Sequence, residues 1–188
     1  MISKEIQAYI SNREHFALKQ ATDKAVSQVL HTARKEIIDL IAANPENFQI
    51  PAEAKLVPQK LNKGNNHLGF PYMVSDFPCV FSIDHIFSFR IMVWYGKSIT
   101  VSLMLSGRFQ ENYKVPKQIM RMDEYKVKRS SSLWDKNTQD EVRFLGSKDK
   151  KHDRGHSLRI NREFHIELIA SLPEIAKTCF EDLLQSKR

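Results

Sequence analysis

The alternation of apolar and polar residues is most regular between Phe87 and Leu105. Apolar side chains occupy every second position in each half of this stretch: Phe87, Phe89, Ile91, Val93 and Tyr95, then Ile99, Val101, Leu103 and Leu105. A period of two is typical of a β-strand with one buried face. Gly96-Lys97-Ser98 separates the halves. The pattern therefore predicts a central β-hairpin over about residues 86–106.

The length of the hairpin loop decides which residues lie opposite each other. A two-residue loop would mix apolar and hydroxyl residues on both faces, because a slip of one residue turns every side chain over. A three-residue loop pairs Tyr95 with Ile99, gathers all apolar residues on one face and places Arg90 opposite Met104. We therefore predict the three-residue loop. The second face then carries Ser88, Arg90, Met92, Trp94, Thr100, Ser102, Met104 and Ser106.

Helical patterns occupy the two ends of the chain. Ser11 to Glu14 has the Ser-x-x-Glu form of a capping box, which predicts a helix beginning near Asn12. Apolar residues then recur at steps of three and four until Asn44-Pro45, which indicates one amphipathic helix of roughly thirty residues. Ser171 to Glu174 repeats the capping form before a last amphipathic helix. The segment 162–170 fits a helix or a strand, and we favour a helix.

Between the helices, several short segments read as strands and loops. Asn62 to Gly69 is rich in Asn and Gly and predicts a loop. The predicted short strands, with a bend at Phe77-Pro78 between the first two, are Pro71–Ser75, Cys79–Ile83, Tyr125–Arg129, Val142–Leu145 and Leu158–Ile160. Helices at both ends with strands between them predict an α+β fold, with an antiparallel sheet around the hairpin.

We expect a single domain over residues 1–188: helical over 1–45, mainly β over 54–161 and helical over 162–187. The long N-terminal helix and the C-terminal helix should cover the apolar face of the sheet. The expected core joins these helices to the hairpin and includes Val26, Val29, Ile37, Leu40, Phe180 and Leu183.

Net charge, cysteine spacing and the lengths of the apolar blocks exclude some classes of protein but do not identify a function. The 188 residues carry a formal net charge of +7, which permits an anionic partner. Cys79 and Cys179 show no paired spacing, so no zinc ribbon or redox dithiol is predicted. The longest apolar block, Ile91 to Tyr95, is too short to span a bilayer. We expect a cytoplasmic protein that does not insert into membranes, and no motif indicates a cofactor or a metal site.

The second face of the hairpin is the leading candidate site, because a single cation lies there among hydroxyl groups and bulky apolar side chains. This mixture suits a small anionic or amphipathic ligand, so the protein is predicted to be a binding module. The site residues are Arg90, Trp94, Met92, Met104, Thr100 and Ser102. Two alternatives stay open: Arg90 pairs structurally with Asp76 or Asp84, or the face forms a homodimer anchored by Trp94.

Two further functional readings rest on other residues. Carboxylates and imidazoles at Asp76, Asp84, His85 and His67 would suit an enzyme of unrecognised type if the fold brought them together. The basic segment 108–159 would suit an accessory domain for nucleic acid or protein, although interspersed acidic residues disfavour nucleic acid. The cations and aromatic rings concerned are Lys126, Lys128, Arg129, Arg143, Lys148, Lys150, Lys151, Tyr125 and Trp134.

Overall fold

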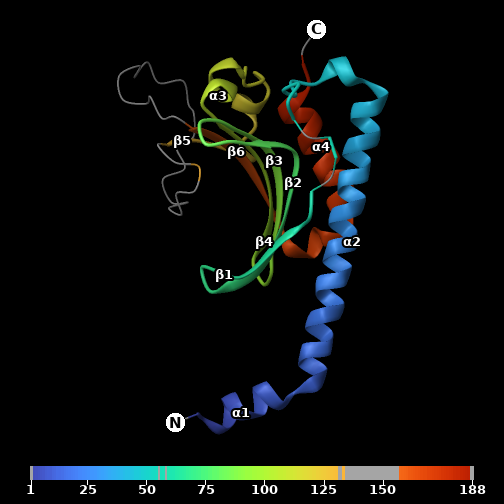
Figure 1. The fold of residues 1–188 in the computed structure, drawn as a ribbon, viewed down its shortest axis with the longest axis vertical. Coiled ribbons are helices and arrows are strands. Elements are labelled where there is room, and N and C mark those ends of the chain that lie inside the picture. The colour runs from blue at the N-terminus through green and yellow to red at the C-terminus, as the bar shows by residue number, and fades with distance from the viewer. Residues whose placement is uncertain (1, 55, 58, 131–132, 134–156, 187–188) are drawn as a thin grey trace.

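The computed structural model describes residues 2–54, 56–57, 59–130, 133 and 157–186 (Figure 1). Within these residues, one antiparallel sheet has the strand order β1-β2-β3-β4-β6-β5. Its strands are β1 (Asn62–His67), β2 (Phe70–Phe81), β3 (Ile86–Trp94), β4 (Ser98–Ser106), β5 (Tyr125–Ser130) and β6 (Ser157–His165). The predicted α+β fold, with the hairpin at the centre of the sheet, is confirmed.

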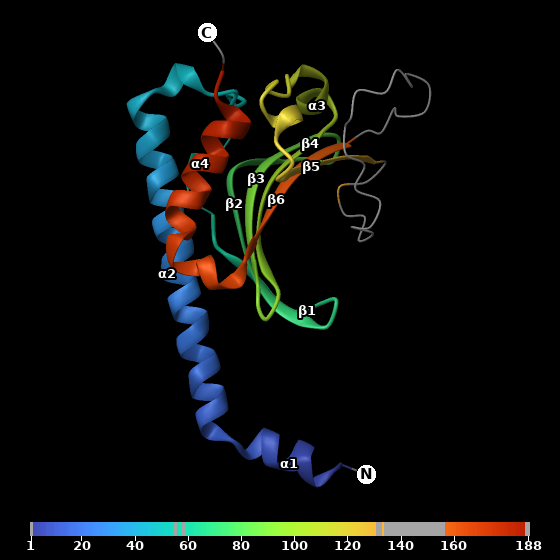
Figure 2. The same cartoon turned by 180° about the vertical axis from the view of Figure 1, so that it is seen from behind.

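Helices cover one face of this curved sheet. The α-helices are α1 (Lys4–Ser11), α2 (Arg13–Ala43), α3 (Arg108–Asn112) and α4 (Leu172–Leu184), and short 3-10 helices are η1 (Pro45–Asn47), η2 (Ile119–Arg121) and η4 (Ile166–Ser171). From opposite viewpoints, α2 and α4 lie side by side against the convex side of the sheet (Figures 1 and 2). Among the helices that the structure describes, none has the length and apolar composition to cross a lipid bilayer.

Helix α2 begins at Arg13, close to the predicted start near Asn12. The capping residue is Asn12 rather than Ser11: its side-chain oxygen accepts a hydrogen bond from the His15 amide at 3.0 Å. Asn12 also ends α1, so one residue separates the two helices and no room is left for a serine cap. The helix continues for 31 residues, which matches the predicted length.

The core lies between the apolar face of the hairpin and the two helices, as predicted. Hairpin residues from Phe87 to Leu105 are buried in one cluster with α2 and α4. The rings of Phe89 and Phe180 meet edge to face, with centroids 5.1 Å apart. Both cysteines are buried thiols. The alternating pattern therefore identified the buried face correctly.

The pairing register within the hairpin differs from the prediction. Trp94 lies opposite Ser98, so the three loop residues are Tyr95, Gly96 and Lys97. Gly96 has a φ of +70°, and this left-handed position at the loop centre favours glycine. The loop has the predicted length but starts one residue earlier, which shifts every partner by two residues and preserves the faces. Arg90 consequently lies opposite Ser102, not Met104.

The segment 62–69 is not a loop throughout. Residues 62–67 form β1, which pairs with β2, and the turn follows at Leu68 and Gly69, where both φ angles are positive. The inter-strand hydrogen bonds outweigh the weak strand preference of Asn and Gly. Position 64 favours glycine, because a Cβ atom there would lie 2.6 Å from the Tyr72 ring.

Two more segments differ from the sequence expectation. The predicted strands before and after Phe77-Pro78 form one strand, β2, whose register shifts between Asp76 and Cys79. The segment 162–170 starts as a strand, because β6 continues to His165 and pairs with β4 before η4 begins. The C-terminal helical region therefore starts at residue 166 rather than 162. The predicted strand Val142–Leu145 lies outside the described residues.

Candidate functional site

The second face of the hairpin holds an ion pair at its centre. Arg90 donates to both oxygens of Asp76, with Nε to Oδ1 at 2.7 Å and Nη2 to Oδ2 at 3.1 Å. Ser88 donates a hydroxyl hydrogen bond to the same carboxylate at 2.7 Å. Asp76 is buried and the Arg90 side chain is 18% exposed. This bidentate geometry makes Asp76 the principal anionic partner of Arg90 within the fold.

The other residues of the predicted ligand site differ in their accessibility. Ser102 and Met104 are each 1% exposed, while Met92, Trp94 and Thr100 are half-buried. The Trp94 indole N–H donates to the backbone oxygen of His67 at 3.1 Å, and the two rings meet at a centroid distance of 4.8 Å. The face therefore combines a buried centre with a partly exposed aromatic end.

The residues proposed for an enzyme do not converge. His67 lies against Trp94 at the end of β3, whereas Asp84 and His85 precede the start of the same strand. The nine residues of β3 separate these ends by roughly 26 Å. Asp76 pairs with Arg90 between them. No group of three or more His, Cys, Asp and Glu side chains suited to a metal ion occurs in the described part of the chain.

The basic segment is described only in part. Strand β5 pairs with β6 and places Lys126 opposite Asn161, and Lys128 opposite Arg159. Tyr125 is buried and donates its hydroxyl hydrogen to Asp182 at 2.8 Å, so its ring is not available for stacking on a base. Arg143, Lys148, Lys150, Lys151 and Trp134 lie outside the described residues. The nucleic-acid hypothesis therefore stays a prediction.

A different site lies on the other side of the molecule, between α2 and the edge of the sheet. We name it the α2–β1 cleft. It has a volume of about 450 Å³ and is lined by Gln20, Asp23, Lys24, Ser27, His31, Lys60, Leu61, Lys63 and Met73. The spacing of the α2 residues at steps of three and four places them on one helix face. Three lysines and one carboxylate make this lining basic.

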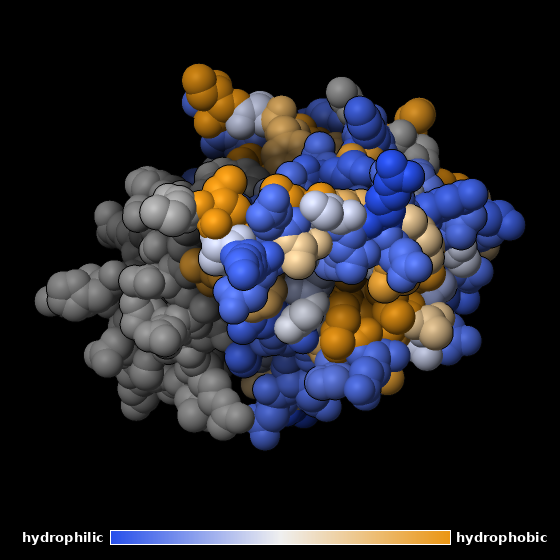
Figure 3. Space-filling view, turned by 90° about the horizontal axis from the view of Figure 1, so that it is seen from below, coloured by the Kyte–Doolittle hydropathy of each residue, from blue (hydrophilic) through white to orange (hydrophobic). Residues whose placement is uncertain are grey.

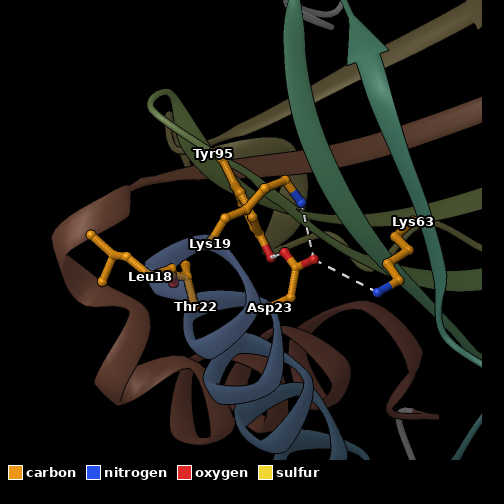
Figure 4. A network of polar contacts seen from close by, with 6 residues as sticks. All are labelled: Leu18, Lys19, Thr22, Asp23, Lys63 and Tyr95. Carbon is orange, nitrogen blue, oxygen red and sulfur yellow. Dashed lines mark hydrogen bonds and ion pairs between the residues drawn. The ribbon is translucent and has the colours of Figure 1, made fainter. Parts of the chain in front are cut away.

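The carboxylate of the cleft already has its partners (Figure 4). Asp23 accepts from the Tyr95 hydroxyl at 3.0 Å and from Lys19 Nζ at 3.1 Å, and Lys63 Nζ lies 3.6 Å away. Tyr95 comes from the β3–β4 loop and Lys63 from β1, so Asp23 ties α2 to two parts of the sheet. The remaining cations, Lys24 and Lys60, are exposed at the cleft.

These contacts shift the pKa values of Asp23 and Tyr95 in opposite directions. Burial alone would raise the pKa of Asp23, but the hydrogen bonds from Lys19 and Tyr95 and the charges of Lys19 and Lys63 hold it below the ordinary value of 3.8. Burial and the neighbouring Asp23 raise the pKa of Tyr95. At neutral pH the network therefore contains an ionised carboxylate and a neutral phenol.

A buried arginine stands beside the cleft. Arg34 is 2% exposed and follows His31 by one turn of α2. Its Nε donates to Ser75 at 2.6 Å and its Nη1 donates to the Gln59 backbone oxygen. Its Nη2 has no hydrogen-bond acceptor among the described residues. Burial lowers the pKa of Arg34 while Asp76 opposes that shift, and an arginine remains charged at neutral pH.

Two other clefts have fewer lysine and arginine side chains in their lining. One, also about 450 Å³, lies beside α3, but its arginine, Arg108, is already bound to Glu53 at 2.7 Å. The other, about 620 Å³, lies near the end of α4 and is lined by two lysines, Lys114 and Lys117. The α2–β1 cleft has the larger number of cations.

Sequence reasoning missed this cleft. Its residues come from three segments, and the segment that contains Lys63 has the composition of a loop although it forms strand β1. One signal was present: Arg34 lies among Leu30, Ala33 and Ile37 on the apolar face of α2. A charged residue at such a position needs partners inside the fold.

Comparisons with protein-family models, with curated proteins and with solved structures find no match for this chain.

Proposed function

We propose that this protein is a binding module for a small anionic ligand, and that the ligand occupies the α2–β1 cleft. The observation that carries the proposal is the charge of the lining: Lys24, Lys60 and Lys63 against the single carboxylate of Asp23, which Lys19 and Tyr95 already bind. An anion in the cleft would meet cations that Asp23 alone does not neutralise.

The buried guanidinium of Arg34 supports the same sign of ligand. Three residues that line the cleft are close in sequence to Arg34 or to its hydrogen-bond partners, so Arg34 lies next to the cleft. His31 precedes Arg34 on α2, Lys60 follows Gln59, and Met73 lies two residues before Ser75. A buried cation is less screened by solvent than the surface lysines. Its positive potential favours an anion at this end of the cleft, even though the guanidinium itself is covered.

Size and lining indicate the kind of anion. A volume of about 450 Å³ lies within the usual range of small-molecule sites. Leu61 and Met73 supply an apolar wall, whereas Gln20 and Ser27 supply polar side chains. This composition favours a phosphate or carboxylate group attached to a small apolar or aromatic body.

Phenyl phosphate is a suitable probe, because it has both parts. Thermal unfolding is measured with phenyl phosphate and with sodium chloride at equal ionic strength. At about ten times Kd, ligand linkage stabilises the fold by about 1.4 kcal/mol, which raises Tm by about 3–6 °C. The triple variant Lys24→Gln, Lys60→Gln, Lys63→Gln should lose this increase.

The matched control replaces three other exposed lysines, Lys35→Gln, Lys114→Gln and Lys117→Gln, and so removes the same charge. It should keep the response to phenyl phosphate. A control variant that loses the response would assign binding to the cleft near the end of α4 instead. An unchanged response in the first variant would refute the proposal.

A further inference from the structure

Strand β1 forms one edge of the sheet, and its outer side pairs with no strand among the described residues (Figure 1). In an antiparallel sheet, every second residue of an edge strand points its N–H and C=O groups away from the sheet. Asn62, Lys63, Asn65 and Asn66 of β1 are also exposed. This edge therefore presents backbone donors and acceptors to which an extended chain can add as a further strand.

The α2–β1 cleft lies beside this edge. The Gln59 backbone oxygen accepts from Arg34, and Lys63 Nζ lies 3.6 Å from Asp23, so residues 59–63 run alongside α2 in the opposite direction. Figure 4 shows Lys63 reaching from β1 toward the helix. Lys63 and its register partner Met73 both line the cleft, which places it on the helix-covered face of the sheet. A strand added to β1 would point alternate side chains to that face.

The other edge of the sheet has no such neighbour. Strand β5 forms that edge, but its residues line none of the three clefts. An unpaired strand edge and a cation-lined cleft therefore occur together at β1.

The geometry limits the length of an added strand. The cleft residues of α2 run from Gln20 to His31, which is about 16 Å along a helix axis. An extended chain covers this distance with about five residues. The register between β1 and β2 shifts between Gly64 and His67, so the regular part of the edge is also short. The edge therefore suits a short segment.

The charge of the cleft selects the side chains of that segment. Lys24, Lys60 and Lys63 lie along it, whereas the carboxylate of Asp23 already accepts two hydrogen bonds. Seen from the end of the molecule where α1 and β1 lie, hydrophilic side chains cover much of the surface (Figure 3). Glutamate or aspartate at alternate positions of an added strand would face the three lysines.

Other occupants fit this edge less well. Antiparallel pairing of two β1 edges would bring Lys60 or Lys63 of one copy close to the lysines of the other, and like charges on paired strands are destabilising. A nucleic acid would match the charge, but it lacks the alternating N–H and C=O groups that pair with a strand edge.

We propose, in a step that rests on the function proposed above, that the anion in the α2–β1 cleft belongs to a short acidic peptide. The peptide adds to β1 as an extra strand and points its carboxylates at the cleft lysines.

Nuclear magnetic resonance titration of the ¹⁵N-labelled full chain tests this proposal. The probe is the end-blocked pentapeptide Glu-Val-Glu-Val-Glu, whose carboxylates share one face of a strand. It should give saturable shifts of the amides at residues 60–64 and 20–31. The peptide Lys-Val-Lys-Val-Lys has the same alternation with the opposite charge and should not bind.

N-methylation separates strand addition from attraction between charges alone. One version of the acidic peptide carries N-methyl groups on its last two glutamates, and the other carries them on its two valines. Each version lacks one alternate set of N–H groups, and only one set points at β1. One version should therefore bind at least about tenfold more weakly than the other.

A lysine variant tests the contribution of the cleft. Lys24→Gln, Lys60→Gln removes two exposed cations from the lining and should weaken binding of the acidic peptide by about fivefold. The control Lys35→Gln, Lys117→Gln removes two exposed lysines that do not line the cleft and should leave binding unchanged.

Several results would overturn the peptide proposal. They are equal affinity of the two N-methylated versions, equal affinity of the lysine and glutamate peptides, unchanged binding to the Lys24→Gln, Lys60→Gln variant, or shifts at β5 instead of β1. If phenyl phosphate shifts the cleft amides but the acidic peptide does not, the peptide proposal fails while the proposed small-ligand function stands. If neither compound binds, both fail.

Discussion

At the scale of single residues, two roles are proposed for Arg90: a structural ion pair with Asp76, and ligand binding on the second face of the hairpin. Its hydrogen bonds to both Asp76 oxygens are those of a structural ion pair, which was one of the alternatives drawn from the sequence. The ligand role on the second face stays a prediction. An ion pair with one buried partner stabilises a fold mainly because, without the pair, the buried carboxylate would have no opposite charge beside it.

We predict that Arg90→Met lowers the free energy of unfolding by about 3 kcal/mol, because the buried Asp76 carboxylate loses the cation that is hydrogen-bonded to it. Urea unfolding gives this value. Adding Asp76→Asn should restore part of the loss, since the amide carries no charge. If Arg90→Met keeps wild-type stability, the ion pair does not stabilise the fold. If it instead abolishes the phenyl phosphate response, the ligand lies on the second face.

Arg34 shows what a sequence can and cannot reveal about single residues. Its place among apolar positions of α2 marks it as unusual. Its partners, Ser75 and the Gln59 backbone, lie 41 and 25 residues away, and no local pattern predicts contacts over such distances. The unusual residue could have been found from sequence, but the cleft beside it could not.

At the scale of elements, alternation predicted the faces of the hairpin but not its exact pairing. Both registers place the same residues in the core, so hydrophobicity alone cannot choose between them. The position of Gly96 in the loop decides, because only the centre of this loop has a positive φ. Strand β1 was missed for a related reason: its Asn and Gly residues gain their strand conformation from pairing with β2.

The network around Asp23 links α2 to β1 and to the β3–β4 loop, and it predicts a specific pH dependence. Because the folded pKa lies below 3.8, the ionised carboxylate stabilises the fold above that pH, and the contribution disappears as pH falls through the folded pKa. Asp23→Asn should therefore cost about 1.5–3 kcal/mol at pH 7 and progressively less in acid.

Urea unfolding of both proteins between pH 7 and pH 3 measures this difference. Asp39→Asn, an exposed carboxylate on the same helix, is the matched control and should change stability little at any pH. A difference between Asp23→Asn and wild type that stays constant through acid pH would contradict the role assigned to this carboxylate.

At the scale of the whole molecule, the sheet with α2 and α4 forms a body, and residues 2–18, whose charged side chains balance, project from it (Figure 1). The cleft lies where α2 crosses the sheet edge, and the Asp23 network beside it holds these elements together.

Nuclear magnetic resonance tests most directly whether an anion binds in the α2–β1 cleft. Phenyl phosphate is titrated into uniformly ¹⁵N-labelled protein and the shifts of the backbone amides are followed. Binding in the α2–β1 cleft should give the largest shifts at residues 20–31 of α2 and at residues 60–63. Shifts concentrated at Arg90, Trp94 and Thr100, or no saturable shifts at all, would contradict it.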